Sequence, residues 1–253
     1  MHRRHLLKAF AGLTLCPLCA AAGLGEEAHH WSYEGATGPG NWGSLDAANQ
    51  TCSTGSQESP IDIAGSINAR LPPLDIRWRK RPDTIVNNGH TIQLNFAEGD
   101  TLNVGDRSYA LKQFHFHHPS EHLVGGKAFA MEAHFVHAAA AGGLAVVGVL
   151  IAPGRANAVF NKIVSTMPAE EGPPVAADPA IDPMRLLPAR RAYYRYEGSL
   201  TTPPCSETVD WLVLADRIEA AEADIARFAK LYPKNARPVQ DRNGRVILSS
   251  GRG

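Results

Sequence analysis

The sequence predicts a mainly β fold, with one large, twisted, mostly antiparallel sheet and a few short peripheral helices. From about residue 74, short runs of strand character follow one another closely, and Gly- or Asn-rich turns separate them. Such spacing is typical of strands joined by hairpins. Apolar residues make up 44% of the 253 residues, so the chain can bury a sizeable core. We find no internal repeat and no second domain.

Four runs before residue 153 have the clearest strand pattern. Residues 91–96 alternate, with Ile92, Leu94 and Phe96 on one face. Residues 144–152 (LAVVGVLIA) have no polar face, which predicts a fully buried strand. The other two runs are 108–117 and 128–137, and strand character returns in RAYYRYEGSL (191–200) and VDWLVLAD (209–216).

The remaining segments are of three kinds. Residues 26–60 have no clear period, but Trp31, Tyr33 and Trp42 need burial, so we expect an ordered, irregular segment. Residues 172–188 are rich in proline and predict a surface loop. Residues 218–232 predict the best helix, because one stripe of that helix holds Ile218, Ala221, Ile225, Phe228 and Ala229.

Residues 1–22 have the layout of a secretory signal peptide. MHRRHLLK is basic, and the apolar run after it ends in alanines and is short for a membrane span. The Arg3-Arg4 pair permits twin-arginine export but also fits an ordinary basic start. A buried N-terminal helix is the other interpretation, and the absence of acidic residues argues against it. We expect one mature domain over 26–250, periplasmic or secreted and not held at the membrane after cleavage.

Charge and cysteine content narrow the function further. The 25 basic and 25 acidic side chains balance, which gives no reason to expect a nucleic-acid partner. The sequence leaves monomer and homodimer open. Cys16 and Cys19 fall inside the predicted signal peptide, so Cys52 and Cys205 remain. In an exported chain this pair is read best as one disulfide, with two buried free thiols as the alternative.

Three histidines have the spacing of a metal site. Side chains alternate along a strand, so His115 and His117 share one face, and His134 lies on one face of the 128–137 run with Glu132. If these strands pair, three imidazoles converge. Three neutral imidazoles with one open position are the coordination of a catalytic zinc ion.

The alternative is that these are hydrogen-bonded core histidines, since H-x-H alone is a weak signal. Gln113 beside His115 and Glu132 beside His134 favour the metal site, because such partners hold a ligand histidine in one tautomer. We expect the other nearby histidines to be surface or structural residues; they are His118, His122 and His137.

Over residues 29–248 the chain resembles the α-class carbonic anhydrases, and more closely their secreted bacterial branch. The motifs are HHWSYEG, QESPIDI, NNGH, QFHFHHPSEH, MEAHFVH, GLAVVGVLI, YEGSLTTPPCSE, VDWLVL and NARPVQ. His118-Pro119 stands where animal members typically have Trp after HFH. The resemblance implies about ten strands, a Cys52–Cys205 disulfide and one Zn²⁺ on His115, His117 and His134.

The resemblance also implies the reaction, which is reversible hydration of carbon dioxide to bicarbonate and a proton. Zinc hydroxide would be the nucleophile, and His90 would be the proton shuttle. Thr201 would accept a hydrogen bond from that hydroxide and donate its proton to Glu121, while Thr202 would contact bicarbonate. The backbone carbonyl of Asn235 would support His117.

Two further groups follow from the same resemblance. A hydrophobic wall for carbon dioxide matches Val136, Val146, Leu200 and Trp211. Positions that order the proton-carrying waters match Tyr33, Asn88 and Gln93.

Two competing functions come from other classes. HFHHPSE also satisfies H-x-H-x3-E, the first half of a cupin metal motif, in which Glu121 would be a fourth ligand and the metal iron or manganese. No second half is recognisable. A carbonic-anhydrase-related protein that only binds is the other alternative, and the presence of all three histidines, Glu121 and Thr201 argues against it.

Overall fold

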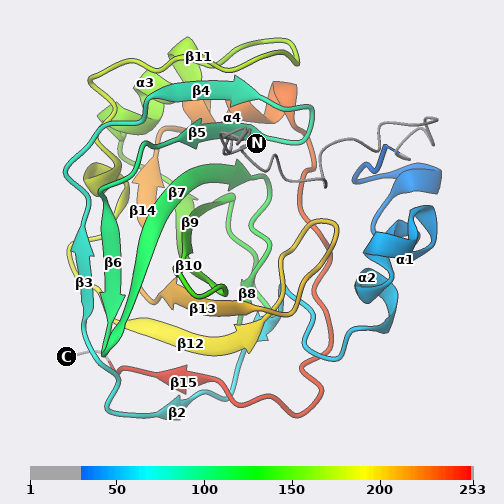
Figure 1. The fold of residues 1–253 in the computed structure, drawn as a ribbon. Coiled ribbons are helices and arrows are strands. Elements are labelled where there is room, and N and C mark those ends of the chain that lie inside the picture. The colour runs from blue at the N-terminus through cyan, green and yellow to red at the C-terminus, as the bar shows by residue number, and fades with distance from the viewer. Residues whose placement is uncertain (1–29, 252–253) are drawn as a thin grey trace, which may run out of the picture.

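The computed structural model describes residues 30–251, so the predicted signal peptide lies outside the described residues. Thirteen strands form one sheet, and a separate parallel pair joins β1 (Asp62–Ile63) to β8 (Leu123–Val124) (Figure 1). The strands of the large sheet are β2 (Ile67–Asn68), β3 (Leu74–Arg77), β4 (Thr84–Asn87), β5 (Ile92–Asn95), β6 (Thr101–Val104), β7 (Arg107–His117), β9 (Met131–Ala138), β10 (Leu144–Pro153), β11 (Val175–Ala176), β12 (Tyr193–Gly198), β13 (Val209–Leu214), β14 (Ile218–Ala220) and β15 (Leu248–Ser249).

The order across the sheet is β11-β4-β5-β7-β9-β10-β13-β12-β15-β2, with β6 beside β7, β3 beside β6, and β14 beside β10. Most neighbours are antiparallel, but β10 is parallel to β13 and to β14, and β15 is parallel to β2. The predicted mainly β fold is therefore confirmed. The sheet is mixed, and it has more strands than the ten implied by resemblance because short edge strands such as β2 and β11 extend it.

The described part of the chain has four α-helices, all short and peripheral: α1 (Trp42–Leu45), α2 (Thr51–Thr54), α3 (Ala158–Thr166) and α4 (Glu222–Leu231). The predicted helix over 218–232 was wrong at its start, because residues 218–220 form β14. There Ile218 pairs with Ile151 of β10, and Ile218 and Ala220 are buried while Glu219 is not. The sequence pattern did not reveal α3, whose first turn is capped by the side chain of Asn157.

Residues 30–251 also contain three 3₁₀ turns: η2 (Gly35–Thr37), η3 (Ala47–Asn49) and η4 (Pro183–Leu186). The proline-rich segment 172–188 is mostly loop, as predicted, although it contributes β11 and η4.

The two faces of the central strands have different neighbours. Phe114 and Phe116 of β7 point to the main core, where Phe116 packs against Phe160 of α3 and Phe228 of α4. His115 and His117 alternate with them and therefore face the opposite side. On that side a second apolar cluster gathers around Val146 and Trp211. The main core thus gives the imidazole face a rigid support.

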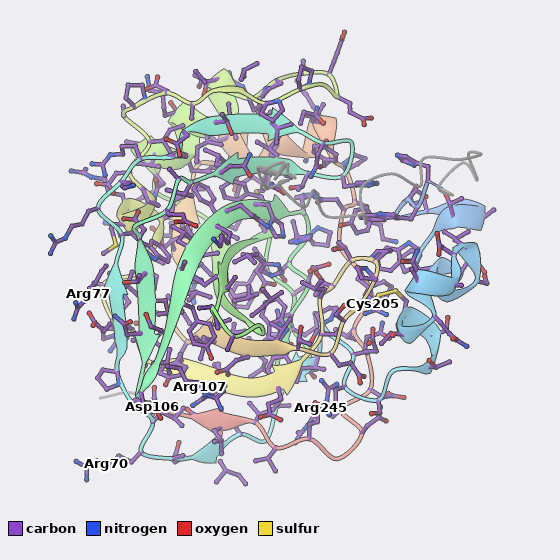
Figure 2. All side chains as sticks on the ribbon, in the orientation of Figure 1. Arg70, Arg77, Asp106, Arg107, Cys205 and Arg245 are labelled. Atoms are coloured by element: carbon purple, nitrogen blue, oxygen red, sulfur yellow. A yellow bond between two sulfur atoms is a disulfide. The ribbon has the colours of Figure 1, made fainter. Side chains whose placement is uncertain are left out.

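The N-terminal segment is ordered and irregular, as expected. Trp42 is fully buried and packs with Trp31 and Tyr33 beside a disulfide that joins Cys52 of α2 to Cys205. Figure 2 shows Cys205 on the side of the sheet that faces α1 and α2. Among residues 30–251, no helix has the length and hydropathy needed to cross a membrane.

Candidate metal centre

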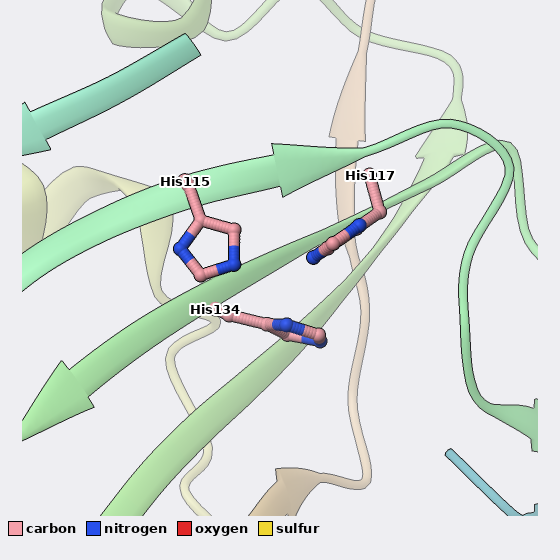
Figure 3. A group of neighbouring side chains, drawn as sticks. All are labelled: His115, His117 and His134. Carbon is pink, nitrogen blue, oxygen red and sulfur yellow. The ribbon is translucent and has the colours of Figure 1, made fainter. Parts of the chain in front are cut away.

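Three imidazole rings converge on one face of the sheet. His115 and His117 come from β7 and His134 from β9, and the strand register sets His115 directly opposite His134. One ring nitrogen from each lies within 4.8 Å of the other two. The ring centroids are 4.6 to 5.4 Å apart, and Figure 3 shows the rings turned toward a common point. The sequence-predicted trio is therefore brought together.

Hydrogen bonds on the outer side of each ring decide which nitrogen faces inward. Nδ1 of His115 lies 2.8 Å from Oε1 of Gln113, and Nδ1 of His117 lies 2.6 Å from the carbonyl oxygen of Asn235. Both partners are acceptors, so these Nδ1 atoms donate and each Nε2 keeps its lone pair. His134 is turned the other way: its Nε2 lies 2.9 Å from Oε1 of Glu132, which leaves Nδ1 free.

Burial keeps these rings uncharged. It lowers the pKa of His115 well below its usual value, lowers that of His117 to about 4, and lowers that of His134 as well. Neutral imidazole is the form that ligates a metal. At neutral pH the cluster therefore presents two Nε2 lone pairs and one Nδ1 lone pair.

Two buried atoms at this cluster have no hydrogen-bond partner among the described residues. They are Nε2 of His117, which carries one of these lone pairs, and Oε2 of Glu121. They lie 3.5 Å apart, and Oε2 is 3.8 Å from Nδ1 of His134. Unpartnered buried acceptors are costly. A cation among the three nitrogens would satisfy the imidazoles, and three nitrogens in a compact, buried site fit Zn²⁺.

Glu121 lies in the connection after β7 and is fully buried. Burial raises the pKa of its carboxyl to about 7, while His134, the nearby Thr201 hydroxyl and the backbone N–H of Arg237 pull in the opposite direction. That N–H donates to Oε1 at 2.8 Å. Because a neighbouring cation favours the charged form, a metal at the imidazoles would keep Glu121 ionised at neutral pH.

Four apolar side chains form a wall next to the imidazoles. Val136 of β9, Val146 of β10 and Trp211 of β13 lie in one row across three neighbouring strands. Leu200, just after β12, packs against the same cluster. The ring centroids of Trp211 and His134 are 4.8 Å apart, so the apolar wall touches the histidine trio.

His90 lies in the turn between β4 and β5, where Oδ1 of Asn88 accepts hydrogen bonds from the backbone N–H groups of His90 and Thr91. Its ring stacks on Trp31 with centroids 3.6 Å apart and planes 7° apart. Burial, and then the nearby His30, lower the pKa of His90, whereas Glu171 raises it. The side chain of Asn235 donates to the carbonyl of His90 and so links this turn to the metal trio.

The remaining expected residues are arranged as follows. Gln93 of β5 lies directly opposite His115. The negative charge of Glu121 adds to burial in raising the pKa of Tyr33, so Tyr33 lies within electrostatic reach of the site. Asn88 uses its side-chain oxygen within its own turn. Thr202 is half-buried, next to the buried Thr201.

Sequence reasoning missed the part played by His122, which was expected to be a surface or structural residue. It is fully buried, so of the two expected roles the structural one is confirmed. Its Nδ1 lies 2.7 Å from Oε1 of Glu132 and its Nε2 lies 2.6 Å from the hydroxyl of Tyr196. Oε2 of Glu132 also accepts the backbone N–H groups of Glu121 and His122, so one carboxylate supports both His134 and the Glu121 connection.

Comparisons of the whole chain with known proteins give consistent matches. A family model described as eukaryotic-type carbonic anhydrase matches residues 37–251. A carbonic anhydrase of Klebsiella pneumoniae is 43% identical over 224 residues, 87% of this chain and 91% of that protein. One of Neisseria gonorrhoeae is 42% identical and covers 93% of this chain and 94% of its own. The alpha-carbonic anhydrase of Thermovibrio ammonificans, solved in complex with the inhibitor sulfanilamide, has a TM-score of 0.85 and 42% identity, covering 87% of this chain and 99% of that chain.

Proposed function

The chain belongs to the eukaryotic-type, alpha-class carbonic anhydrase family, and on that premise we propose how its residues carry out the reversible hydration of carbon dioxide. It is a carbonic anhydrase, a lyase, and its substrates are carbon dioxide and bicarbonate. The proposal concerns the metal, the proton carrier and the residues around them.

His115, His117 and His134 hold one Zn²⁺ ion through Nε2, Nε2 and Nδ1. The observation that carries this assignment is the unpartnered, buried Nε2 of His117 beside two further ring lone pairs. Zinc bound by three nitrogens lowers the pKa of a bound water to about 7, a magnitude taken from carbonic anhydrases themselves, which are the standard example. Gln113, Glu132 and the carbonyl of Asn235 fix the tautomers.

Thr201 and Glu121 orient the nucleophile. The ionised carboxylate of Glu121 can only accept hydrogen bonds, and it accepts one from the N–H of Arg237. When Thr201 donates its hydroxyl proton to this carboxylate, its oxygen is left as an acceptor. The site then favours an oxygen that can donate a proton to Thr201 and disfavours ligands that cannot. Thr202 contacts bicarbonate.

The apolar wall receives carbon dioxide, which is small, neutral and apolar. Val136, Val146, Leu200 and Trp211 offer it a surface with few competing hydrogen bonds, so little water must be displaced from polar groups when it binds. Bicarbonate is charged and gains little from this wall, which favours its release.

His90 carries the released proton toward solvent. A side chain that titrates near neutrality can take up a proton on an unprotonated ring nitrogen and pass it to buffer. Its place in the turn that joins β4 to β5 and its contact with Trp31 fit a carrier outside the ligand set. Tyr33, Asn88 and Gln93 order the waters between the site and His90.

Residues 1–22 direct export to the periplasm or beyond, and residues 26–250 are the mature domain. The disulfide between Cys52 and Cys205 supports an oxidising compartment. N-terminal sequencing of protein from a periplasmic fraction should begin after about residue 22. A start at Met1 in that fraction would overturn cleavage.

A metal analysis combined with a hydration assay tests the function. Purified protein should contain one zinc per chain and should accelerate acidification of buffer by dissolved carbon dioxide, and a zinc chelator should abolish the effect. H117A should lose most zinc, because two imidazoles hold the ion poorly. Stoichiometric zinc in H117A would refute the ligand set. Iron or manganese with carboxylate ligation would favour the cupin-like alternative, and zinc-loaded protein without activity would favour a binding role.

A further inference from the structure

Glu171, in the connection between α3 and β11, lies against the turn that bears His90. Gly89 has a positive φ of +83°, and a methyl group at its Cα would come within 2.8 Å of Oε2 of Glu171 and 3.0 Å of its Cδ. The carboxylate therefore rests on the backbone immediately before His90. Because Gly89 has no side chain, the Glu171 carboxylate can occupy the space next to its Cα.

Hydrogen bonds on both sides of Glu171 hold its segment in this position. The side chain of Asn87 donates to the carbonyl of Pro168 at 3.2 Å, and the N–H of Gly172 donates to the carbonyl of Asn87 at 3.1 Å. Further along, β11 pairs with β4 (Figure 1). The segment is thus fixed to the end of β4, and Glu171 lies between the two contacts.

Three titratable groups surround the His90 turn on different elements. They are His30 from the N-terminal segment, whose ring centroid is 5.1 Å from that of His90, Tyr232 at the end of α4, and Glu171. Burial and His30 lower the pKa of His90, whereas the charge of Glu171 raises it. Among these groups Glu171 is the acid, so it is the one that favours a proton on His90.

We propose that Glu171 is a positioning residue for proton transfer, which holds its negative charge over Gly89 to stabilise the protonated ring of His90. The inference rests on the proposed shuttle role of His90. Without Glu171, His90 would accept a proton from the site less readily at neutral pH, while the bond-forming step would be unaffected. A nearby second acid, Glu170, is exposed and provides a matched control.

The first experiment is an NMR titration of zinc-loaded protein at low salt. The ring Cε1–H resonance of His90 is assigned by its absence in H90A. In E171Q the midpoint for His90 should fall by about 0.2–0.7 pH unit, the range expected for an exposed charge pair. In E170Q, which removes the same charge one residue away, it should stay within about 0.1 unit of wild type, and added salt should shrink the E171Q effect.

The second readout is kinetic. In weak buffer E171Q should lower kcat by about 1.5- to 3-fold and leave kcat/KM unchanged. The factor for kcat should be smaller than the factor by which E171Q changes the proton-binding constant of His90. An E171Q titration equal to wild type, or an equal shift in E170Q, would overturn the inference. If H90A keeps full turnover in weak buffer, the shuttle assignment itself fails, and the inference fails with it. If H90A is slow but E171Q matches E170Q in both readouts, the inference alone fails.

Discussion

Replacing Glu132 with Gln tests the support beneath the metal trio more sharply than removing a ligand. The Glu132 carboxylate is fully buried and accepts four hydrogen bonds. Oε2 accepts from the backbone N–H groups of Glu121 and His122 at 3.0 and 2.9 Å. Oε1 faces Nδ1 of His122 at 2.7 Å and Nε2 of His134 at 2.9 Å. Although burial by itself raises the pKa of Glu132, the two rings hold it well below its usual range.

In E132Q the amide oxygen can serve only one of these two donor pairs. If the amide oxygen accepts the two backbone N–H groups, the NH₂ group faces the ring N–H groups of His122 and His134. Each ring N–H that loses its acceptor in this way destabilises the folded protein by about 1–3 kcal/mol. His134 can relieve its share by moving its proton to Nδ1, but Nδ1 is the atom turned toward the other two imidazoles. Zinc must then compete with that proton, so its affinity should fall by about 10- to 100-fold, or about 1.4–2.7 kcal/mol.

Competition with a chromophoric chelator measures the zinc Kd, and calorimetry of the metal-free protein measures Tm. The metal-free E132Q protein should melt about 3–10 °C below wild type. E197Q is the control, because it makes the same change at an exposed residue on β12. A Kd within twofold of wild type together with an unchanged Tm would refute the reasoning.

Three further predictions follow from other parts of the structure. V146F should place a ring into the apolar wall and lower kcat/KM for hydration by roughly tenfold with zinc content unchanged, and an unchanged kcat/KM would contradict the assigned pocket. C52S/C205S opens a loop spanning 153 residues, so stability measured in denaturant should fall by up to ~5 kcal/mol; equal stability would count against the disulfide. Burial lowers the pKa of His137 to about 4, so as pH falls from 6.5 to 4 the unfolded chain binds a proton that the folded one does not, and stability should fall by up to about 3 kcal/mol. In denaturant unfolding at pH 7 and pH 4.5, H137Q should lose the share of this pH dependence that His137 supplies and keep the share of His115, His117 and His134, whose pKa values burial also lowers; an unchanged pH dependence would contradict the share given to His137.

The strand period explains how much of the site could be predicted from the sequence. Because side chains alternate, Phe114 and Phe116 had to point away from His115 and His117, and Phe116 indeed packs against Phe160 of α3 and Phe228 of α4. The same period set Glu132 and His134 on one face. Local alternation was sufficient because all of these residues lie in long strands, on the side of the β7 irregularity between Leu111 and Gln113 where the pairing with β9 is regular.

Period arguments fail where strands are short or absent. Ile218 fits a helical stripe with Ala221 and also fits a three-residue strand with Ala220, and the open edge of β10 decided for the strand. His122 lies in a connection, so no period could reveal that its ring joins Glu132 to Tyr196. That network is formed by residues far apart in sequence, and only the folded arrangement brings them together.

The segment after α4 contributes two backbone groups to the candidate site. It has no regular structure, yet the carbonyl of Asn235 holds His117 and the N–H of Arg237 holds Glu121. Both groups belong to the backbone, so they do not depend on which side chain stands at residue 235 or 237. They depend on the position in which this segment of the chain is fixed. The buried guanidinium of Arg237 fixes it by donating to Glu58 and to the carbonyls of Ser59 and Cys52. The order of the candidate metal site thus depends on contacts with the N-terminal segment, near the disulfide that also ties down the chain just after Thr201 and Thr202. A change at Arg237 should therefore disturb both His117 and Glu121, although its charged group touches neither.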